Sequence, residues 1–175
     1  RRRVLSSLEE AEQTPDPNQR RFLQSVVVVG GGPSGCELAG SLNDLMRHSL
    51  ARDFKQLNPA ECLVTLVDPG DRVLRAMNPS LSQAAESYLS GAGIKLLLGA
   101  RVQEISEGKV VVSTAEGSQT LEAATICWTA GVRASHLGKV LAAATGCTVD
   151  KGGRVVVEPD FSIPNHPEIR VIGDL

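Results

Sequence analysis

Short apolar runs and helically spaced apolar residues alternate through the middle of the chain. Val26 to Val29 is a run of four valines, and residues 63–67 and 94–98 form similar runs. Each has the length and composition of a strand buried on both faces. After the first run, one face of a helix is apolar, formed by Leu38, Ala39, Leu42, Leu45 and Met46. The pattern therefore predicts strand, helix and strand in succession.

A second helix is predicted between residues 78 and 91. Asn78 followed by Pro79 is a typical helix start, and Gly91 is suited to the helix end. Residues 102–121 predict a β-meander of short strands, and residues 124–129 predict one more buried strand. This order of elements is typical of an α/β fold. We expect a doubly wound, Rossmann-like parallel sheet with a β-meander crossover.

The two ends of the chain follow different patterns. Residues 1–21 contain a helical apolar stripe that a Thr-Pro-Asp-Pro segment ends, and we interpret them as a lead-in helix and linker. Residues 22–131 form the predicted nucleotide-binding domain. Residues 132–175 are interpreted as the stub of a second domain, with strands at 155–157 and 170–172 that have no local partner. Because unpaired strands invite pairing with another chain, a homo-oligomer is one expected consequence.

Composition limits the classes of function. The chain is 42% hydrophobic and 22% charged, which is ordinary for a globular protein, and its net charge of −2 argues against a nucleic-acid partner. No apolar run approaches the roughly 18 residues of a membrane span. The four cysteines lack metal-site or Cys-x-x-Cys spacing, so we expect free thiols, no metal and an intracellular location. A start without Met and an abrupt end suggest a piece of a longer protein.

The segment from Gly30 to Gly35 carries the most specific chemistry. Its sequence, GGGPSG, matches G-x-G-x-x-G between a buried strand and a helix, the context in which this motif binds dinucleotides. We expect Gly30 to make the turn, Gly32 to admit a pyrophosphate and Gly35 to allow close helix packing. The helix beginning at Pro33 and Ser34 would present free N–H groups and a positive dipole end to the phosphates.

Asp68 ends the second predicted strand, where an acidic residue accepts hydrogen bonds from the adenosine ribose. It lies 33 residues after Gly35, further than the usual offset of about 20, because a polar insertion intervenes. A carboxylate there repels a 2′-phosphate, so NADH is favoured over NADPH. NADPH remains an alternative ligand, because Arg72 lies close by in the sequence. Asp68 is alternatively only a turn residue. Glu37 is either a site residue or a carboxylate stabilised by the helix start.

Two stretches resemble a known family. Residues 26–40, VVVVGGGPSGCELAG, are similar to the nicotinamide-nucleotide motif of the pyridine nucleotide-disulfide oxidoreductase superfamily. Residues 127–135, CWTAGVRAS, and the lead-in at 10–17 are similar to the type II NADH dehydrogenases within it. Residues 172–174 resemble the second flavin-contacting motif of that family. The sequence departs from the pattern at Cys36, where an aliphatic residue is usual, and at Asp68, where Glu is commoner.

The resemblance implies a flavoenzyme that passes a hydride from NADH to FAD and then electrons to a quinone. It implies that the glycines and Asp68 hold NADH, that Glu37 lies near the nicotinamide as a catalytic residue, and that Ala130 and Gly131 flank the cofactor. Asp174 would contact FAD. The family's FAD-binding glycine motif and membrane-anchoring helices would lie outside residues 1–175. We therefore expect a fragment that binds NADH without turnover, from a whole protein that is peripheral to the membrane.

Two other functions remain open. One is a related flavoprotein reductase that delivers electrons to ferredoxin or another protein. The other is a regulatory module that senses NAD without chemistry. The meander and the terminal Gly-Asp favour an enzyme, because a sensor has no need of a flavin motif.

Overall fold

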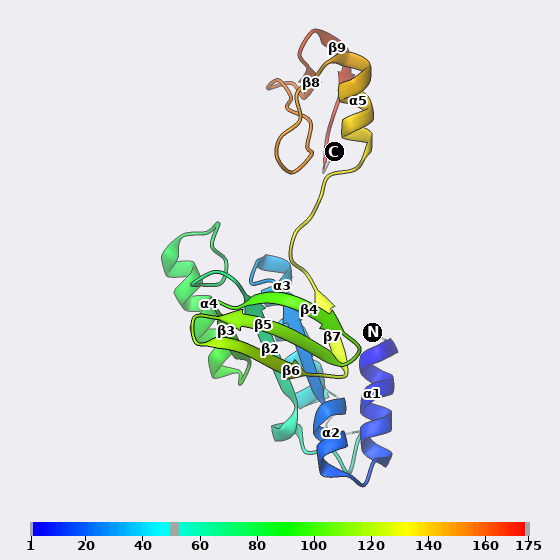
Figure 1. Cartoon of the computed structure of the whole chain (residues 1–175), viewed down its shortest axis with the longest axis vertical. Helices are drawn as coiled ribbons and strands as arrows, with labels where there is room; N and C mark the ends of the chain where they lie inside the picture. The colour runs from blue at the N-terminus through cyan, green and yellow to red at the C-terminus, as the bar shows by residue number, and fades with distance from the viewer. Residues whose placement is uncertain (1, 50–52, 174–175) are drawn as a thin grey trace. The chain divides into compact units, whose positions relative to one another are not determined.

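A parallel sheet of four strands, in the order β3–β2–β1–β7, carries the predicted nucleotide loop (Figure 1). The strands are β1 (Ser25–Val29), β2 (Leu63–Asp68), β3 (Lys95–Leu98) and β7 (Thr125–Trp128). The central strand β1 is paired on both sides, so that Val28 lies opposite Leu66 of β2 and Cys127 of β7. One helix connects β1 to β2 and another connects β2 to β3. The Rossmann-like fold predicted from the sequence is therefore confirmed.

This computed structural model describes residues 2–49 and 53–173 of the chain. The chain divides into two compact units between Ala130 and Gly131. The first unit contains the parallel sheet with its helices and the meander. The second is a smaller unit with one helix and one hairpin.

Four helices and two short helical turns accompany the sheet. The helices are α1 (Arg2–Gln13), α2 (Pro17–Leu23), α3 (Pro33–Asp44) and α4 (Pro79–Gly91), and the turns are π-helical (Leu45–Ser49) and 3-10 (Pro59–Glu61). Asn78 caps α4 as predicted, because its side chain accepts a hydrogen bond from Ser80 N. The helix ends at Gly91, as predicted, but the capping residue is Ala92 and the left-handed glycine is Gly93.

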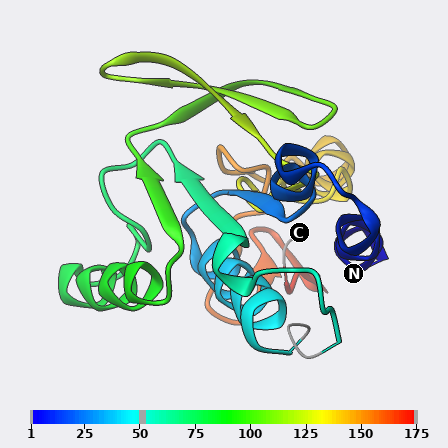
Figure 2. The same ribbon diagram turned by 90° about the horizontal axis from the view of Figure 1, so that it is seen from below.

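The valines of β1 divide between two hydrophobic cores, one on each face of the sheet. Val26 and Val28 pack with α3 residues such as Ala39. Val27 and Val29 pack with residues of the meander. Figure 2 shows α3 and the meander on opposite sides of the sheet. Burial on both faces explains why the run contains no polar residue.

The meander forms a separate antiparallel sheet and confirms the predicted crossover between β3 and β7. Its strands are β4 (Arg101–Ser106), β5 (Lys109–Thr114) and β6 (Gly117–Glu122). Val110 and Val112 of the middle strand are completely buried against the parallel sheet. The intervening Val111 points to the other side and is only half-buried, as expected for the alternation of a strand.

The N-terminal helix α1 packs on the same core as α3. Val4, Leu8 and Ala11 are buried, which is the stripe that the helical spacing predicts. The following helix α2 was not expected from the pattern. It begins where Asp16 accepts a hydrogen bond from Asn18 N and Pro17 takes the first helical position.

The second unit does not contain the strands that were predicted at residues 155–157 and 170–172. It contains α5 (Leu137–Thr145) and an antiparallel hairpin of β8 (Ser162–Ile163) and β9 (His166–Arg170). Residues 155–157 are not a strand; Val155 forms only an isolated bridge with Val149. The C-terminal strand begins earlier than expected and has a local partner, because Asn165 adopts a left-handed conformation (φ 67°) that closes a tight turn.

Candidate nucleotide-binding site

The chain turns sharply from β1 into α3 at the glycine loop. Gly30 has φ 115°, a conformation that favours glycine, and its N–H donates to Val67 O at 2.8 Å. A Cβ on Gly30 would lie 2.8 Å from Ala130 N, and one on Gly35 would overlap the Gly30 carbonyl oxygen. Residues Gly30 and Gly35 must therefore be glycines, because a side chain at either position would prevent the close approach of α3 to β1.

Gly32 lies in open space at the start of α3. It is the N-cap residue, it is exposed, and no atom lies within 4 Å of a Cβ placed on it. No side chain caps the helix here, and Pro33 and Ser34 are exposed in its first turn. The N–H groups and the positive dipole end of α3 thus face an unobstructed space, which fits a dinucleotide pyrophosphate.

Asp68 connects the glycine loop to the end of β2. Its Oδ2 accepts a hydrogen bond from Gly31 N at 2.6 Å, and its Oδ1 accepts one from Gly70 N at 2.7 Å. The bond with Gly70 N gives Asp68 the role of a turn residue, which was one of the two roles that the sequence allowed. The bond with Gly31 N places the carboxylate against the glycine loop. Each oxygen retains acceptor capacity, so the group can still receive a ribose hydroxyl.

Thr129 and Ala130 lie at the same edge of the sheet, after β7. Thr129 Oγ1 lies 2.8 Å from Val29 O and 3.3 Å from Gly30 O. The role of Thr129 was missed from the sequence, although its position directly after a parallel strand was the available signal. Gly131 begins the second unit with φ 70°. Asp174 lies outside the described residues.

A loop after β2 completes one side of the site. Leu74 N donates to Gly31 O at 2.7 Å, and Leu74 has a left-handed φ of 51°, which is rare for such a residue. Together with the glycine loop this segment encloses a pocket of about 350 Å³, lined by Gly31, Gly32, Pro33, Asp68, Pro69, Leu74, Arg75, Ala76 and Met77. Arg72 does not line it; its Nη2 donates to Arg75 O at 3.2 Å. No periodicity in the sequence indicates this loop.

Cys36 and Glu37 lie in the first turns of α3. Cys36 is half-buried, and its thiol donates to Gly31 O at 3.6 Å. Burial raises the pKa of this thiol, and the negative charge of Asp68 raises it further. Cys36 therefore stays protonated at neutral pH and fills space behind the loop. Glu37 is exposed, and its catalytic role stays a prediction.

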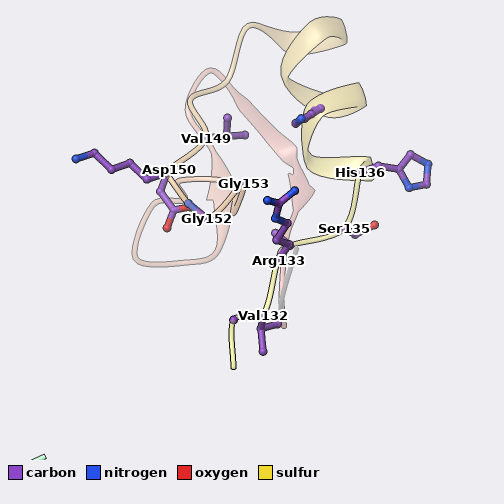
Figure 3. Close-up of a pocket in the computed structure, with 12 residues that line it drawn as sticks. Val132, Arg133, Ser135, His136, Val149, Asp150, Gly152 and Gly153 are labelled. Carbon is purple, nitrogen blue, oxygen red and sulfur yellow. The ribbon is translucent and has the colours of Figure 1, made fainter. Parts of the chain in front are cut away.

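A larger pocket, of about 570 Å³, lies within the second unit (Figure 3). It is lined by residues 131–136, Lys139 and residues 149–153. Its only acidic lining residue, Asp150, accepts hydrogen bonds from Gly152 N and Arg154 N. These bonds lower the pKa of Asp150, the one from Arg154 N most strongly. The carboxylate thus organises its own loop, and of the predicted site residues only Gly131 lines this pocket.

Neither a membrane span nor a metal cluster is present in the part of the chain that the structure describes. No helix there is long and apolar enough to cross a bilayer. No group of three metal-ligating side chains comes together in the same residues.

The parallel sheet, the glycine loop and the acidic residue at the end of β2 are the features that dinucleotide-binding domains share. The comparison with known sequences agrees in detail. The chain belongs to the pyridine nucleotide-disulphide oxidoreductase family, which it matches over residues 1–175.

Curated relatives support the more specific resemblance. The chain is 38% identical over its whole length to the type II NADH:quinone oxidoreductase Ndh of Mycobacterium tuberculosis, and 31% identical over 86% of its length to the type II NADH:quinone oxidoreductase of Staphylococcus epidermidis. It spans 38% and 36% of these two relatives. The resemblance inferred from residues 26–40 and 127–135 is thus confirmed.

Solved structures show the same fold. The structure of NDH2 from Plasmodium falciparum in complex with NADH superposes with a TM-score of 0.73 at 18% identity, over 81% of this chain and 29% of that one. A ferredoxin reductase from Rhodopseudomonas palustris gives a TM-score of 0.63 at 27% identity, over 90% of this chain and 35% of that one.

Proposed function

We propose that this chain is the NADH-binding part of a type II NADH:quinone oxidoreductase. The observation that carries the proposal is the hydrogen bond from Gly31 N to Asp68 Oδ2, beside the open space at Gly32. It brings a carboxylate for ribose and a helix start for pyrophosphate into one pocket. The relatives of this name, of which the chain spans about two fifths, support the choice among dinucleotide enzymes.

The geometry assigns a part of NADH to each element. The pyrophosphate would accept hydrogen bonds from N–H groups at the start of α3, where Gly32 leaves room for it. The adenosine ribose would donate to the Asp68 carboxylate. Gly30 and Gly35 would contribute by letting α3 lie close enough to β1 for the pocket to form.

The remaining roles concern the nicotinamide end and the flavin. Bound NADH supplies the hydride. We propose that Glu37, Ala130 and Gly131 border the nicotinamide and that Asp174 contacts FAD. Quinone reduction, FAD binding and attachment to the membrane surface are proposed for the whole protein.

Titration of the chain with NADH tests the proposal. Calorimetry should show saturable binding of one NADH, tighter than that of NADPH, because Asp68 repels a 2′-phosphate. Trp128, the single tryptophan, donates its indole N–H to Ala130 O and offers a fluorescence signal at the site edge. Gly32→Val should abolish binding in a folded chain. Absence of NADH binding by the native chain would refute the proposal.

A reductase that transfers electrons to a protein is the second candidate. It is favoured by the likeness to a ferredoxin reductase at 27% identity over 90% of the chain. Both candidates bind a nicotinamide nucleotide, so the acceptor separates them. A whole-length protein that reduces ferredoxin faster than a soluble quinone would favour the reductase.

A further inference from the structure

The larger pocket, within the second unit, is lined by cationic side chains that the proposed function does not use. Arg133, Lys139 and Lys151 line it, and Asp150 is its only acidic lining residue. The pocket has a volume of about 570 Å³ and is formed entirely by residues of the range 131–153 (Figure 3). The positive charge is local, because the chain as a whole carries a net charge of −2.

Three segments form the walls of this pocket and contact one another directly. The segment before α5 is tied to the loop that contains Asp150, because Ala134 N donates to Gly152 O at 3.1 Å. The start of α5 lies so close to the same loop that a Cβ on Gly138 would lie 2.8 Å from Gly153 O. These contacts fix the walls relative to one another, so a ligand would meet a preformed pocket.

The one carboxylate of the pocket is already neutralised. Asp150 Oδ1 accepts hydrogen bonds from Gly152 N at 2.7 Å and from Arg154 N at 2.9 Å. Asp150 Oδ2 lies 2.9 Å from both Nε and Nη2 of the Arg154 guanidinium. Arg154 does not line the pocket, so the negative charge of Asp150 is balanced by a cation outside the lining set.

The three lining cations have no carboxylate of their own. Among residues 2–49 and 53–173, no carboxylate oxygen lies within 4 Å of the charged nitrogens of Arg133, Lys139 or Lys151. In Figure 3 the Arg133 side chain extends between the Asp150 loop and the start of α5, whereas the His136 ring points away from it. Like charges around one pocket repel one another, and a bound anion would relieve this repulsion.

We propose that this pocket binds a phosphate-bearing anion through Arg133, Lys139 and Lys151. Phosphate oxygens accept hydrogen bonds from guanidinium and ammonium groups, and a planar guanidinium donates two in parallel. A free phosphorylated compound and an anionic lipid headgroup offer this same chemistry. None of the three cations belongs to the proposed NADH site, so the inference stands apart from the proposed function.

Calorimetric titration with inorganic pyrophosphate tests the site in the Gly32→Val variant of the 175-residue chain, which is expected to exclude phosphates from the glycine loop. In this background Arg133→Ala should weaken pyrophosphate binding about tenfold, the loss of a charge-assisted contact, and Lys139→Ala should also weaken it. Arg133→Lys should retain part of the affinity. Arg101→Ala is the matched control, because Arg101 is an exposed arginine of β4 in the first unit. It should leave the affinity unchanged.

Sedimentation with lipid vesicles identifies the source of the phosphate. The vesicles contain equal parts of phosphatidylcholine and phosphatidylglycerol, and pure phosphatidylcholine is the control. Binding to the anionic vesicles that Arg133→Ala weakens would support the site and assign it to a lipid headgroup. Pyrophosphate binding that depends on Arg133, without binding to vesicles, would support the site and assign it to a free phosphorylated compound.

Three results would overturn the inference. The first is a folded Gly32→Val chain that binds neither pyrophosphate nor the anionic vesicles. The second is binding that Arg133→Ala leaves unchanged, which would place the anion elsewhere. The third is an equal loss in Arg133→Ala and Arg101→Ala, which would indicate a diffuse effect of net charge. Circular dichroism shows whether each variant is folded, and NADH binding by the native chain decides the proposed function separately.

Discussion

Two glycines of the nucleotide loop, three residues apart, should respond to substitution in opposite ways. A Cβ at Gly35 would overlap the Gly30 carbonyl oxygen and lie 2.8 Å from Thr129 Oγ1. A Cβ at Gly32 would meet no protein atom within 4 Å. Gly35→Ala should therefore disturb the fold, and Gly32→Val should disturb only the ligand.

The loss of stability expected for Gly35→Ala follows from the atoms that must move to make room for the new Cβ. Two of the three nearest atoms belong to the backbone of Gly30, which β1 holds in the centre of the sheet, so α3 has to shift. Overpacking of this kind costs about 1–3 kcal/mol. At about 3 °C for each kcal/mol in a domain of this size, Tm should fall by roughly 3–9 °C.

The Gly32→Val substitution should leave the free energy of unfolding almost unchanged. Its φ of −75° and ψ of 179° are extended values that valine adopts readily. Valine is a poorer N-cap than glycine, but it also lowers the entropy of the unfolded chain, and these effects are similar in size, each about 0.5–1 kcal/mol. Its branched side chain occupies the space assigned to the pyrophosphate.

Thermal melting followed by circular dichroism, together with calorimetric titration of NADH, tests both variants. Gly40→Ala is a suitable control, because a Cβ on this α3 glycine meets no atom within 4 Å. The reasoning fails if Gly35→Ala melts like the native chain. It also fails if the folded Gly32→Val variant binds NADH with native affinity.

Three further substitutions test other contacts. Asp68→Ala should weaken NADH binding by about 1–3 kcal/mol in calorimetry, because it removes a charged acceptor and releases the glycine loop; unchanged affinity would contradict the ribose role. Asn78→Ala should lower the free energy of unfolding in urea by about 1 kcal/mol through loss of the α4 cap, with Ser80→Ala as a milder control. Asp150 has a lowered pKa, so its contribution to the loop is present at neutral pH and is lost as pH falls below about 4. Asp150→Asn should reduce hydrogen-exchange protection of the Val156 amide, which bonds to Thr148 O, at neutral pH; equal protection would refute this role.

The parallel sheet was predictable because few structures are compatible with the residues of its strands. A run such as Val26 to Val29 is stable only when both faces are covered, and the glycine motif that follows sets the next helix. The cap at Asn78 acts through its immediate neighbours, so it too was visible in the sequence. These features depend on contacts within a few residues or on a period that the chain repeats.

The missed features of the pocket depend on contacts between distant residues. Arg75 lies in the pocket because Leu74 bonds to Gly31, and nothing in the intervening sequence indicates that pairing. The sequence directed attention to Arg72, whose guanidinium instead holds a backbone carbonyl. The hairpin of the second unit was misplaced because a left-handed Asn165 gives no apolar signal.

The contact of Thr129 with Val29 O also bears on the order in which the molecule folds. It joins residues 100 positions apart, whereas β1 meets β2 at the nearer pair of Val29 and Val67. Closing the longer loop costs about 0.9 kcal/mol more entropy, so pairing with β2 is the easier first step. Ala130 reaches Gly30 only when β7 has docked on the other side of β1. The proposed nucleotide site is thus completed only after residue 130 has been synthesised, and a nascent chain cannot be stabilised by its ligand before then.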